Sequence, residues 1–289
     1  MEKKTIRLLY PQWQGGDVAR WVPEVPDAGE ASRGYALGAR LLHFLAPQSG
    51  VETYEVPVAM GRGERKTAGG VLDRDVIAAQ TRAALDLLHV VGPDKIVTFG
   101  GDCSASVVPF AYLAHRYEGK VAVVWIDAHP DLTLPGDAYT GFHAMALSAC
   151  LGLGDPAIAG LLPARLDASR ALLVGVRDWE RNEVKERAAR LGVAHLTPEE
   201  ARADAARLTA WLAATGASRV VVHLDLDVLD PSEIVAAVGQ VPAGLRLAEV
   251  VRLVQQMADA CELVGLTVAE PMPRTALLLR SMLSQLPLL

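Results

Sequence analysis

The chain has 289 residues, and its 28 Lys and Arg against 34 Asp and Glu give a formal net charge of −6. Hydrophobic residues make up 51% and charged residues 21% of the sequence, which excludes a disordered, collagen-like or low-complexity chain. The mild acidity argues against nucleic acid as a partner, no apolar run is long enough to span a bilayer, and three cysteines are too few for a disulfide framework. We therefore expect a cytoplasmic protein that does not bind nucleic acid or membrane.

Short apolar, β-branched runs alternate with longer amphipathic stretches along the chain. The alternation is typical of a parallel sheet covered by helices on both faces, and because about eight strands follow one another without a linker, we expect a single domain over residues 1–289. Two loops rich in Pro, Gly and polar residues, 22–33 and 133–140, are expected at the surface. The predicted strands lie near residues 6–10, 51–58, 95–99, 121–127, 171–176, 193–196, 219–225 and 263–269. The predicted helices lie near residues 34–45, 73–91, 105–115, 143–151, 179–191, 203–214, 245–260 and 275–284.

Acids and metal-ligand residue types follow the ends of several predicted strands. In open parallel sheets ligands bind outside the carboxyl ends of the strands, so residues at these ends are candidates for a site. Packing does not explain why five strands deliver such residues to one edge. The segments are Gly100-Gly101-Asp102-Cys103-Ser104, Asp127-Ala128-His129-Pro130-Asp131, Arg177-Asp178-Trp179-Glu180, His223-Leu224-Asp225-Leu226-Asp227 and the strand end at Glu270.

Two of these clusters have the spacing of metal ligands. Asp127, His129 and Asp131 stand at alternate positions, so their side chains can point the same way, and Asp225 and Asp227 repeat that spacing. Carboxylates this close repel one another unless a cation neutralises them. Four Asp and one His suit divalent transition metals, and a pair of such ions would generate a metal-bound hydroxide. The alternative, loop aspartates that only close turns, accounts less well for two such clusters at strand ends.

Four segments give the chain a resemblance to a known family: 100–104, 125–131, 223–231 and, more weakly, 268–273. By these segments it resembles the ureohydrolase superfamily, the group of arginases, agmatinases and formiminoglutamases. The resemblance implies a three-layer α/β/α sandwich with an eight-stranded parallel sheet and a binuclear centre, usually of manganese. It also implies hydrolysis of an amidine or guanidinium C–N bond in a small-molecule substrate, and a homo-oligomer.

The resemblance assigns roles position by position. Asp131 would orient the bridging hydroxide, His143 would deliver a proton to the leaving amine, and Glu270 would hold the guanidinium. Glu180 and Glu183 match a loop whose acids hold an α-amino group. The alternatives are a hydrogen-bonded histidine at a helix start, an ordinary strand-end glutamate, and acids in an exposed first helical turn. The implied metal ligands are Cys103, Asp127, His129, Asp131, Asp225 and Asp227, of which Asp127 and Asp225 would bridge both ions.

Cys103 departs from the family, which has histidine at this position. A thiolate is a legitimate metal ligand, but it adds negative charge and shifts preference from manganese toward zinc, iron, cobalt or nickel. Alternatively, the thiol stays protonated and one ion is weak or absent. A nucleophilic cysteine or a thiol-based sensor is a further possibility. Cys150 and Cys261 lie in apolar helical stretches and are expected to be small core residues.

His223 and the segment after it are further departures. The family usually has serine at 223, so His223 is expected to be a hydrogen-bonded core residue, a neighbour of the metal ligands or a compensating ligand. Residues 232–242 keep only parts of the family's pocket loop, so the substrate should not be assumed to be arginine or agmatine. We expect a metal-dependent hydrolase of a guanidino, amidino or related C–N bond. The alternative is a non-catalytic or metal-depleted binding or regulatory protein on the same scaffold.

Overall fold

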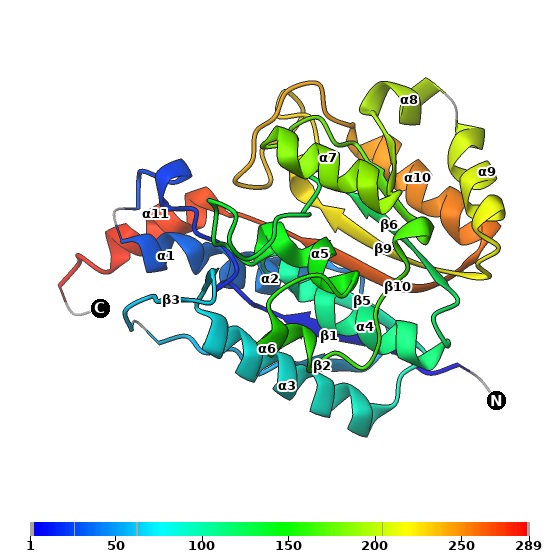
Figure 1. The fold of residues 1–289 in the computed structure, drawn as a ribbon. Helices are drawn as coiled ribbons and strands as arrows, with labels where there is room; N and C mark the ends of the chain where they lie inside the picture. The colour runs from blue at the N-terminus through cyan, green and yellow to red at the C-terminus, as the bar shows by residue number, and fades with distance from the viewer. Residues whose placement is uncertain (1–2, 26, 62, 204, 288–289) are drawn as a thin grey trace.

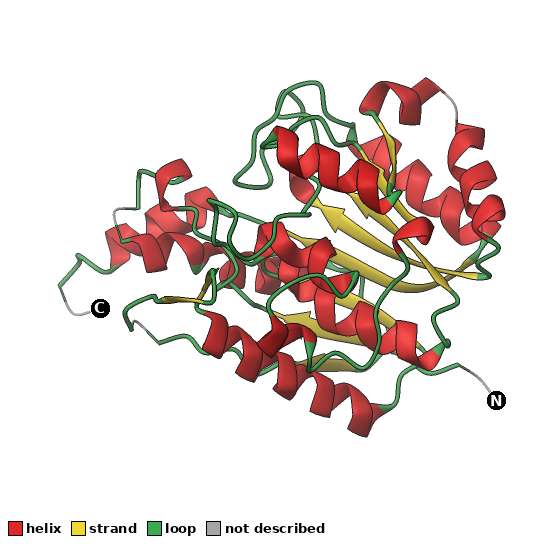
Figure 2. Cartoon of the chain, in the orientation of Figure 1, coloured by secondary structure: helices red, strands yellow, loops and turns green. Residues whose placement is uncertain are grey.

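A computed structural model describes residues 3–25, 27–61, 63–203 and 205–287, with a central sheet of eight strands that all run parallel (Figures 1 and 2). The strand order is β2-β1-β5-β10-β9-β6-β7-β8. The expected α/β architecture with an eight-stranded parallel sheet is therefore confirmed. The strands are β1 (Thr5–Tyr10), β2 (Thr53–Glu55), β5 (Lys95–Gly100), β6 (Val121–Ile126), β7 (Ala171–Val174), β8 (Ala194–Leu196), β9 (Arg219–Asp225) and β10 (Glu262–Ala269).

Helices cover both faces of the sheet. One face packs against α3 (Arg74–Val91), α4 (Val107–Arg116), α5 (Ala146–Cys150) and α7 (Asn182–Leu191). The other packs against α2 (Gly34–Leu45), α9 (Ala205–Thr215) and α10 (Leu247–Ala260). The core therefore has two halves, separated by the sheet.

Strand β6 shows how the sequence produces this arrangement. All six of its residues, Val-Ala-Val-Val-Trp-Ile, are buried, because a central parallel strand is covered on both sides. Side chains alternate between the faces. Val121, Val123 and Trp125 join the half of the core that contains α4, and Ala122, Val124 and Ile126 join the half that contains α10.

Several predicted boundaries differ from the structure. The strand expected near 51–58 is limited to β2, because at the sheet edge it has only β1 to pair with. The helix expected at 143–151 begins as a 3-10 helix, His143–Met145, and the one expected at 179–191 begins only at Asn182. The sequence analysis missed a small hairpin and two short helices. These are β3 (Thr67–Ala68), β4 (Val71–Leu72), α6 (Pro156–Ala159) and α8 (Pro198–Ala203).

The expectation of a surface loop at 22–33 is wrong. This segment contains α1 (Ala28–Ser32), which Asp27 caps by accepting a hydrogen bond from the Glu30 amide. Val22 and Val25 are buried in a small cluster against Met272. The polar residues that predicted a surface loop include Asp27, which caps this helix.

The strands deliver their carboxyl ends to one edge of the molecule. In Figure 1, β10 runs toward the side that carries α1 and α11 (Arg274–Leu283), and β9 runs in the same direction. Among the described residues, no helix has both the length and the apolar character needed to cross a bilayer.

Candidate metal centre

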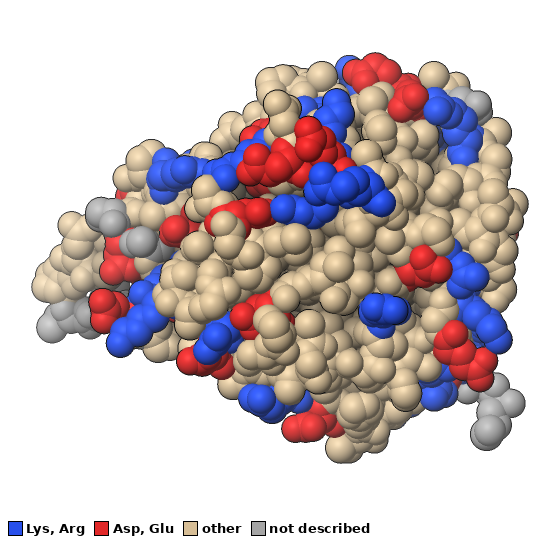
Figure 3. Space-filling view, in the orientation of Figure 1, with Lys and Arg blue, Asp and Glu red and all other residues tan. Residues whose placement is uncertain are grey.

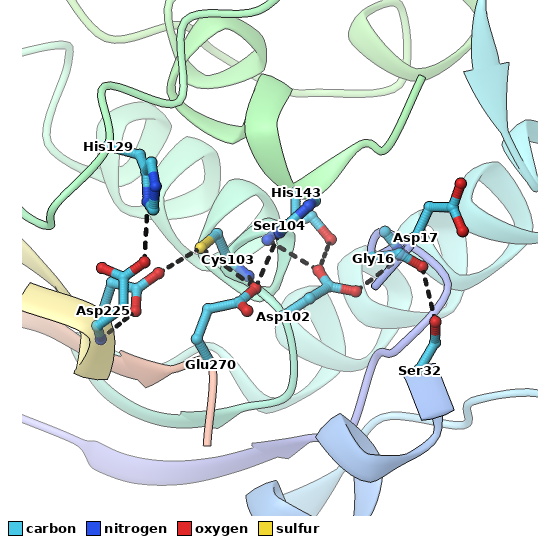
Figure 4. Close-up of polar contacts among 12 residues, drawn as sticks. Gly16, Asp17, Ser32, Asp102, Cys103, Ser104, His129, His143, Asp225 and Glu270 are labelled. Atoms are coloured by element: carbon cyan, nitrogen blue, oxygen red, sulfur yellow. Dashed lines mark hydrogen bonds and ion pairs between the residues drawn. The ribbon is translucent and has the colours of Figure 1, made fainter. Parts of the chain in front are cut away.

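Four neighbouring strands end around one buried cluster of polar side chains. Strands β5, β10, β9 and β6 are adjacent in the sheet, so the residues that follow them meet at its carboxyl edge. Figure 4 shows the result: Cys103 lies between Asp225 and Glu270, with His129 beside the aspartate and His143 beside the glutamate. The sequence-predicted clusters are thus brought together in space.

Glycine 101 and Asp102 fix the position of Cys103. A Cβ on Gly101 would lie 1.8 Å from the Gln12 carbonyl oxygen, so only glycine allows this approach of two backbones. Asp102 caps the following 3-10 helix, η2 (Cys103–Ser106), by accepting a hydrogen bond from the Ser104 amide. The Cys103 thiol is thereby held 3.0 Å from Asp225 Oδ2.

Burial raises the pKa of the Cys103 thiol well above its ordinary value, and the charges of Asp131 and Asp225 raise it further. In the absence of a cation the thiol is therefore protonated, and it donates to Asp225 Oδ2. A metal ion would have to displace this proton to bind the sulfur.

A second group consists of Asp127, His129 and Asp227. His129 Nδ1 lies 2.8 Å from Asp227 Oδ2, and the His129 amide donates to Asp127 Oδ1 at 2.7 Å. Burial acts to lower the pKa of His129, but the charges and hydrogen bonds of Asp227 and Asp127 together outweigh burial and hold the pKa well above its ordinary value. One ligand atom from each of these three residues lies within 4.8 Å of the others, a spread that one ion can close.

Burial raises the pKa of the carboxyl groups of Asp127, Asp225 and Asp131. Burial, and next the charge of Asp227, raise the pKa of Asp127 to about 7. Burial and the same neighbour raise the pKa of Asp225 well above its usual range. Asp131 is buried, its pKa is raised by burial and by Asp127, and its Oδ2 has no hydrogen-bond partner in the described part of the chain. Such a cluster is stabilised by cations.

The side chains gathered at this edge of the sheet fit divalent metal ions for two reasons. Thiol, imidazole and carboxylate groups are assembled within bonding reach, and the carboxylates are strained by mutual repulsion. The predicted ligands Cys103, Asp127, His129, Asp225 and Asp227 fall into such groups. Asp131 does not belong to these groups, although it lines the same cavity.

Glu270 and His143 lie beside Cys103. Glu270 Oε1 accepts hydrogen bonds from the Cys103 amide at 3.1 Å and from the thiol at 3.5 Å, and lies 3.1 Å from His143 Nδ1. The other ring nitrogen, Nε2, lies 2.7 Å from the Tyr139 hydroxyl. Burial acts to lower the pKa of His143, but Tyr139 and Glu270 together hold it well above its ordinary value. The His143 ring is thus held between a carboxylate and a hydroxyl group.

These groups form part of the floor of a cavity of about 880 Å³. Its walls come from loops, including the segment 133–140 that was expected at the surface. Figure 3 shows acidic and basic side chains gathered over α7, and Val184 of this helix and its N-cap residue Arg181 line one wall. Other wall residues are Arg20, Trp21, Glu24, Asp137, Tyr139, Asp178, Glu180 and Val241.

The two acids predicted to hold an amino group have different positions. Glu180 lines the cavity and accepts a hydrogen bond from the Thr133 hydroxyl at 3.3 Å. Glu183 is exposed in the first turn of α7, 3.7 Å from an Arg181 nitrogen, and is not among the residues that line the cavity.

Backbone strain concentrates around the cavity. Among the described residues other than glycine, six have a positive φ. Three of them, Asp131 (φ 50°), Glu180 (φ 57°) and Glu270 (φ 63°), line the cavity. Residues other than glycine rarely adopt a positive φ unless the surrounding structure imposes it. Residues with this strained backbone cluster at functional sites.

The sequence analysis missed one contributor to this cluster, Tyr139. Tyr139 contacts His143 directly, but it lies in a loop without a recognisable motif, and its position four residues before His143 was the only available signal. Cys150 is buried, as expected, and Cys261 is only partly so.

Comparison with known proteins now shows the family. The Arginase family model matches residues 53–277, more than half of the chain, so the chain belongs to the arginase family. An N(omega)-hydroxy-L-arginine amidinohydrolase from Streptomyces lavendulae is 33% identical over 199 residues, which cover 68% of this chain and 67% of that protein. An arginase from Entamoeba histolytica is 26% identical over 188 residues, covering 62% of each protein.

Solved structures show the same fold. An arginase from Bacillus caldovelox has a TM-score of 0.74 at 24% identity, with 100% of both chains covered. A formimidoylglutamase from Bacillus subtilis has a TM-score of 0.67 at 16% identity, covering 96% of this chain and 85% of that one. The arginase-like fold expected from the sequence is therefore confirmed.

Proposed function

We propose that this chain is a metal-dependent hydrolase that cleaves a guanidino, amidino or related non-peptide C–N bond in a small cationic substrate. The observation that carries the proposal is a cavity whose floor joins two groups of metal ligands to His143 and Glu270. Membership in the arginase family supports it, because similar proteins include an amidinohydrolase and an N(1)-aminopropylagmatine ureohydrolase.

The acidic floor would hold two divalent ions. Ions bound there supply Lewis acidity that makes water a nucleophile near neutral pH. Manganese is the metal expected from the family, and the sulfur of Cys103 brings zinc, iron, cobalt and nickel into competition. The proposed ligands are Asp127 and Asp225, shared by both ions, His129 and Asp227 for one, and Cys103 and Asp131 for the other.

Three side chains would act on substrate and protons. The Glu270 carboxylate binds the substrate cation, whose N–H donors replace His143 as its partner. His143, released from Glu270, delivers a proton to the leaving nitrogen. The free Oδ2 of Asp131 accepts a hydrogen bond from the attacking water and orients it.

The walls would select the rest of the substrate. Glu180 faces the cavity and is proposed to bind a substrate amino group, whereas a direct role for Glu183 stays a prediction. A homo-oligomer and a cytoplasmic location also stay predictions.

A metal-loading assay tests the proposal. The protein is incubated with Mn, Zn, Fe, Co or Ni, its metal content is measured, and release of urea or ammonia is followed over a panel of guanidino and amidino compounds. We expect close to two ions per chain and turnover of at least one compound. Asp127→Asn should lose more than about 100-fold in activity, because a shared ligand matters more than the supporting groups of a metal site.

Glu186→Gln is the matched control, since Glu186 is exposed on α7, pairs with Arg190 and lies outside the cavity. It should retain full activity. Two bound ions without product from any compound would contradict the proposal. One ion or none after every incubation, again without product, would favour the alternative of a non-catalytic protein on this scaffold.

A further inference from the structure

His223 on β9 is a buried histidine to which the proposed function assigns no role. Its side chain is 0% exposed. Its Nδ1 lies 2.8 Å from the Ser106 hydroxyl, and its ring stacks on Trp125 with centroids 3.7 Å apart and planes 14° from parallel. These two contacts hold the ring in one orientation.

The second ring nitrogen of His223 lacks a partner. Nε2 makes no hydrogen bond within the described part of the chain and lies 3.9 Å from Asp127 Oδ2. A buried polar atom without a partner is rare and calls for a ligand, a water molecule or an ion. With Nδ1 engaged by the Ser106 hydroxyl, Nε2 is the ring nitrogen that is left to bind such a ligand.

The sulfur of Cys103 belongs to the same group of potential ligand atoms as His223. The ligand atoms of Cys103, Asp127, His223 and Asp225 all lie within 4.8 Å of one another, and all four residues are buried. In a tetrahedral site with bonds of about 2.0–2.3 Å, ligand atoms are about 3.3–3.8 Å apart. An ion bound there would draw the four atoms together from their spread of up to 4.8 Å.

We propose that Cys103, Asp127, His223 and Asp225 together bind one divalent ion, with His223 Nε2 as a direct ligand. The inference rests on the proposed function, since it concerns one half of the same centre. It replaces Asp131 by His223 in that half. The imidazole that the family carries at position 103 is thus supplied from position 223, and a thiolate takes its former place.

The two halves of the centre then differ in chemistry. Sulfur and nitrogen together with carboxylate oxygens select zinc, cobalt or ferrous iron over manganese. The neighbouring group of Asp127, His129 and Asp227 offers one nitrogen and carboxylate oxygens, which also suit manganese. The two donor sets therefore favour a mixed pair of ions.

Cobalt substitution tests the inference without measuring activity. The full-length protein is stripped with a chelator and titrated with Co²⁺ alone, and its absorption spectrum is recorded. We expect a sulfur-to-cobalt charge-transfer band in the near ultraviolet and the strong visible bands of four-coordinate cobalt. Cys103→Ser should remove the charge-transfer band, whereas Cys261→Ser, at a partly buried cysteine outside these ligand groups, should keep it.

His223→Ser, which restores the residue usual in the family, separates a ligand from a core residue. When His223 is a ligand in the wild type, the variant should bind the first Co²⁺ at least about 10-fold more weakly, and its visible bands should change while the charge-transfer band persists. The rise in Tm on adding cobalt should also shrink. A merely structural histidine would lower Tm equally with and without metal and leave the affinity unchanged, which would overturn the inference.

X-ray absorption of the zinc-loaded protein gives an independent measurement, with one sulfur expected at about 2.3 Å from zinc. Two bound ions with only oxygen and nitrogen neighbours would overturn the inference and leave the proposed function standing. A protein that binds no ion under any condition would overturn both.

Discussion

The floor and the walls of the cavity are built by different means. The floor comes from residues that directly follow four adjacent strands, and its side chains are buried and held by backbone contacts such as the 2.7 Å bond from the Glu270 amide to the Gly101 carbonyl. The walls come mainly from loops, and their side chains range from half-buried, as at Tyr139, to exposed, as at Glu180. The difference teaches that the chemistry of the site and its substrate specificity can change separately. The chemistry depends on floor residues that the sheet positions, whereas specificity depends on wall residues that the sheet does not position.

Replacing Gly101 by Ala should have the largest effect, because it disturbs the backbone that supports the floor. The new Cβ would meet the Gln12 carbonyl oxygen at 1.8 Å, and neither backbone can move without displacing η2. We expect the free energy of unfolding to fall by about 3 kcal/mol or more, and metal content to fall with it. Urea denaturation followed by circular dichroism measures the first quantity.

Gly50→Ala is the control for this substitution, since a Cβ there has no atom within 4 Å. It should change the unfolding free energy by less than about 0.5 kcal/mol. A Gly101→Ala protein as stable as the Gly50→Ala protein would show that the floor is less rigid than described.

Tyr139→Phe tests the link between wall and floor. It removes the hydroxyl that lies 2.7 Å from His143 Nε2 while keeping the ring. We expect kcat to fall about 10-fold, equivalent to about 1.4 kcal/mol, with little change in KM, because the proton carrier loses its orientation. The control is Tyr54→Phe, which removes a hydroxyl that bonds Glu52 and should behave like the wild type; equal kcat values for the two variants would refute the link.

Arg187→Met tests the frame that supports one wall. The pair between Arg187 and Asp137 is largely buried, with N and O 2.8 Å apart. Burial acts to raise the pKa of Asp137, but the hydrogen bond and charge of Arg187 hold it below its ordinary value. The pair therefore stabilises the fold above the unfolded pKa of about 3.9, and this contribution is lost as pH falls through the folded pKa.

We expect Arg187→Met to cost about 1 kcal/mol at pH 7 and progressively less below about pH 4, as measured by denaturation at several pH values. Arg190→Met removes an exposed pair with Glu186 and should cost almost nothing. A penalty that is independent of pH would point to lost packing of the arginine stem instead.

Glu180→Gln should have the smallest effect and sharpen the contrast between walls and floor. Its carboxylate is exposed, so losing its charge should raise KM for a substrate with an amino group by about 3-fold and leave kcat unchanged. Steady-state kinetics with paired substrates, with and without that amino group, measures this. An equal change for both substrates would exclude a role in recognition.

The sequence predicted which residues gather at the sheet edge, but not which residues form the walls, for physical reasons. The continuous apolar run before Asp127 predicts a buried central strand, and its end locates the ligands because parallel strands share one carboxyl edge. The loop 133–140 has no such periodicity, so the contact between Tyr139 and His143 depends on tertiary packing. The position of His223 Nε2 depends likewise on Ser106 and Trp125, which come from two other elements.

The left-handed backbone at Asp131, Glu180 and Glu270 has a consequence for protein engineering. Glycine at these positions would relax the main chain while deleting the functional group. A selection for thermal stability alone would therefore tend to accept such changes, and the most stable variants would be the least active ones. Screens on this scaffold should score turnover and thermal survival in the same well.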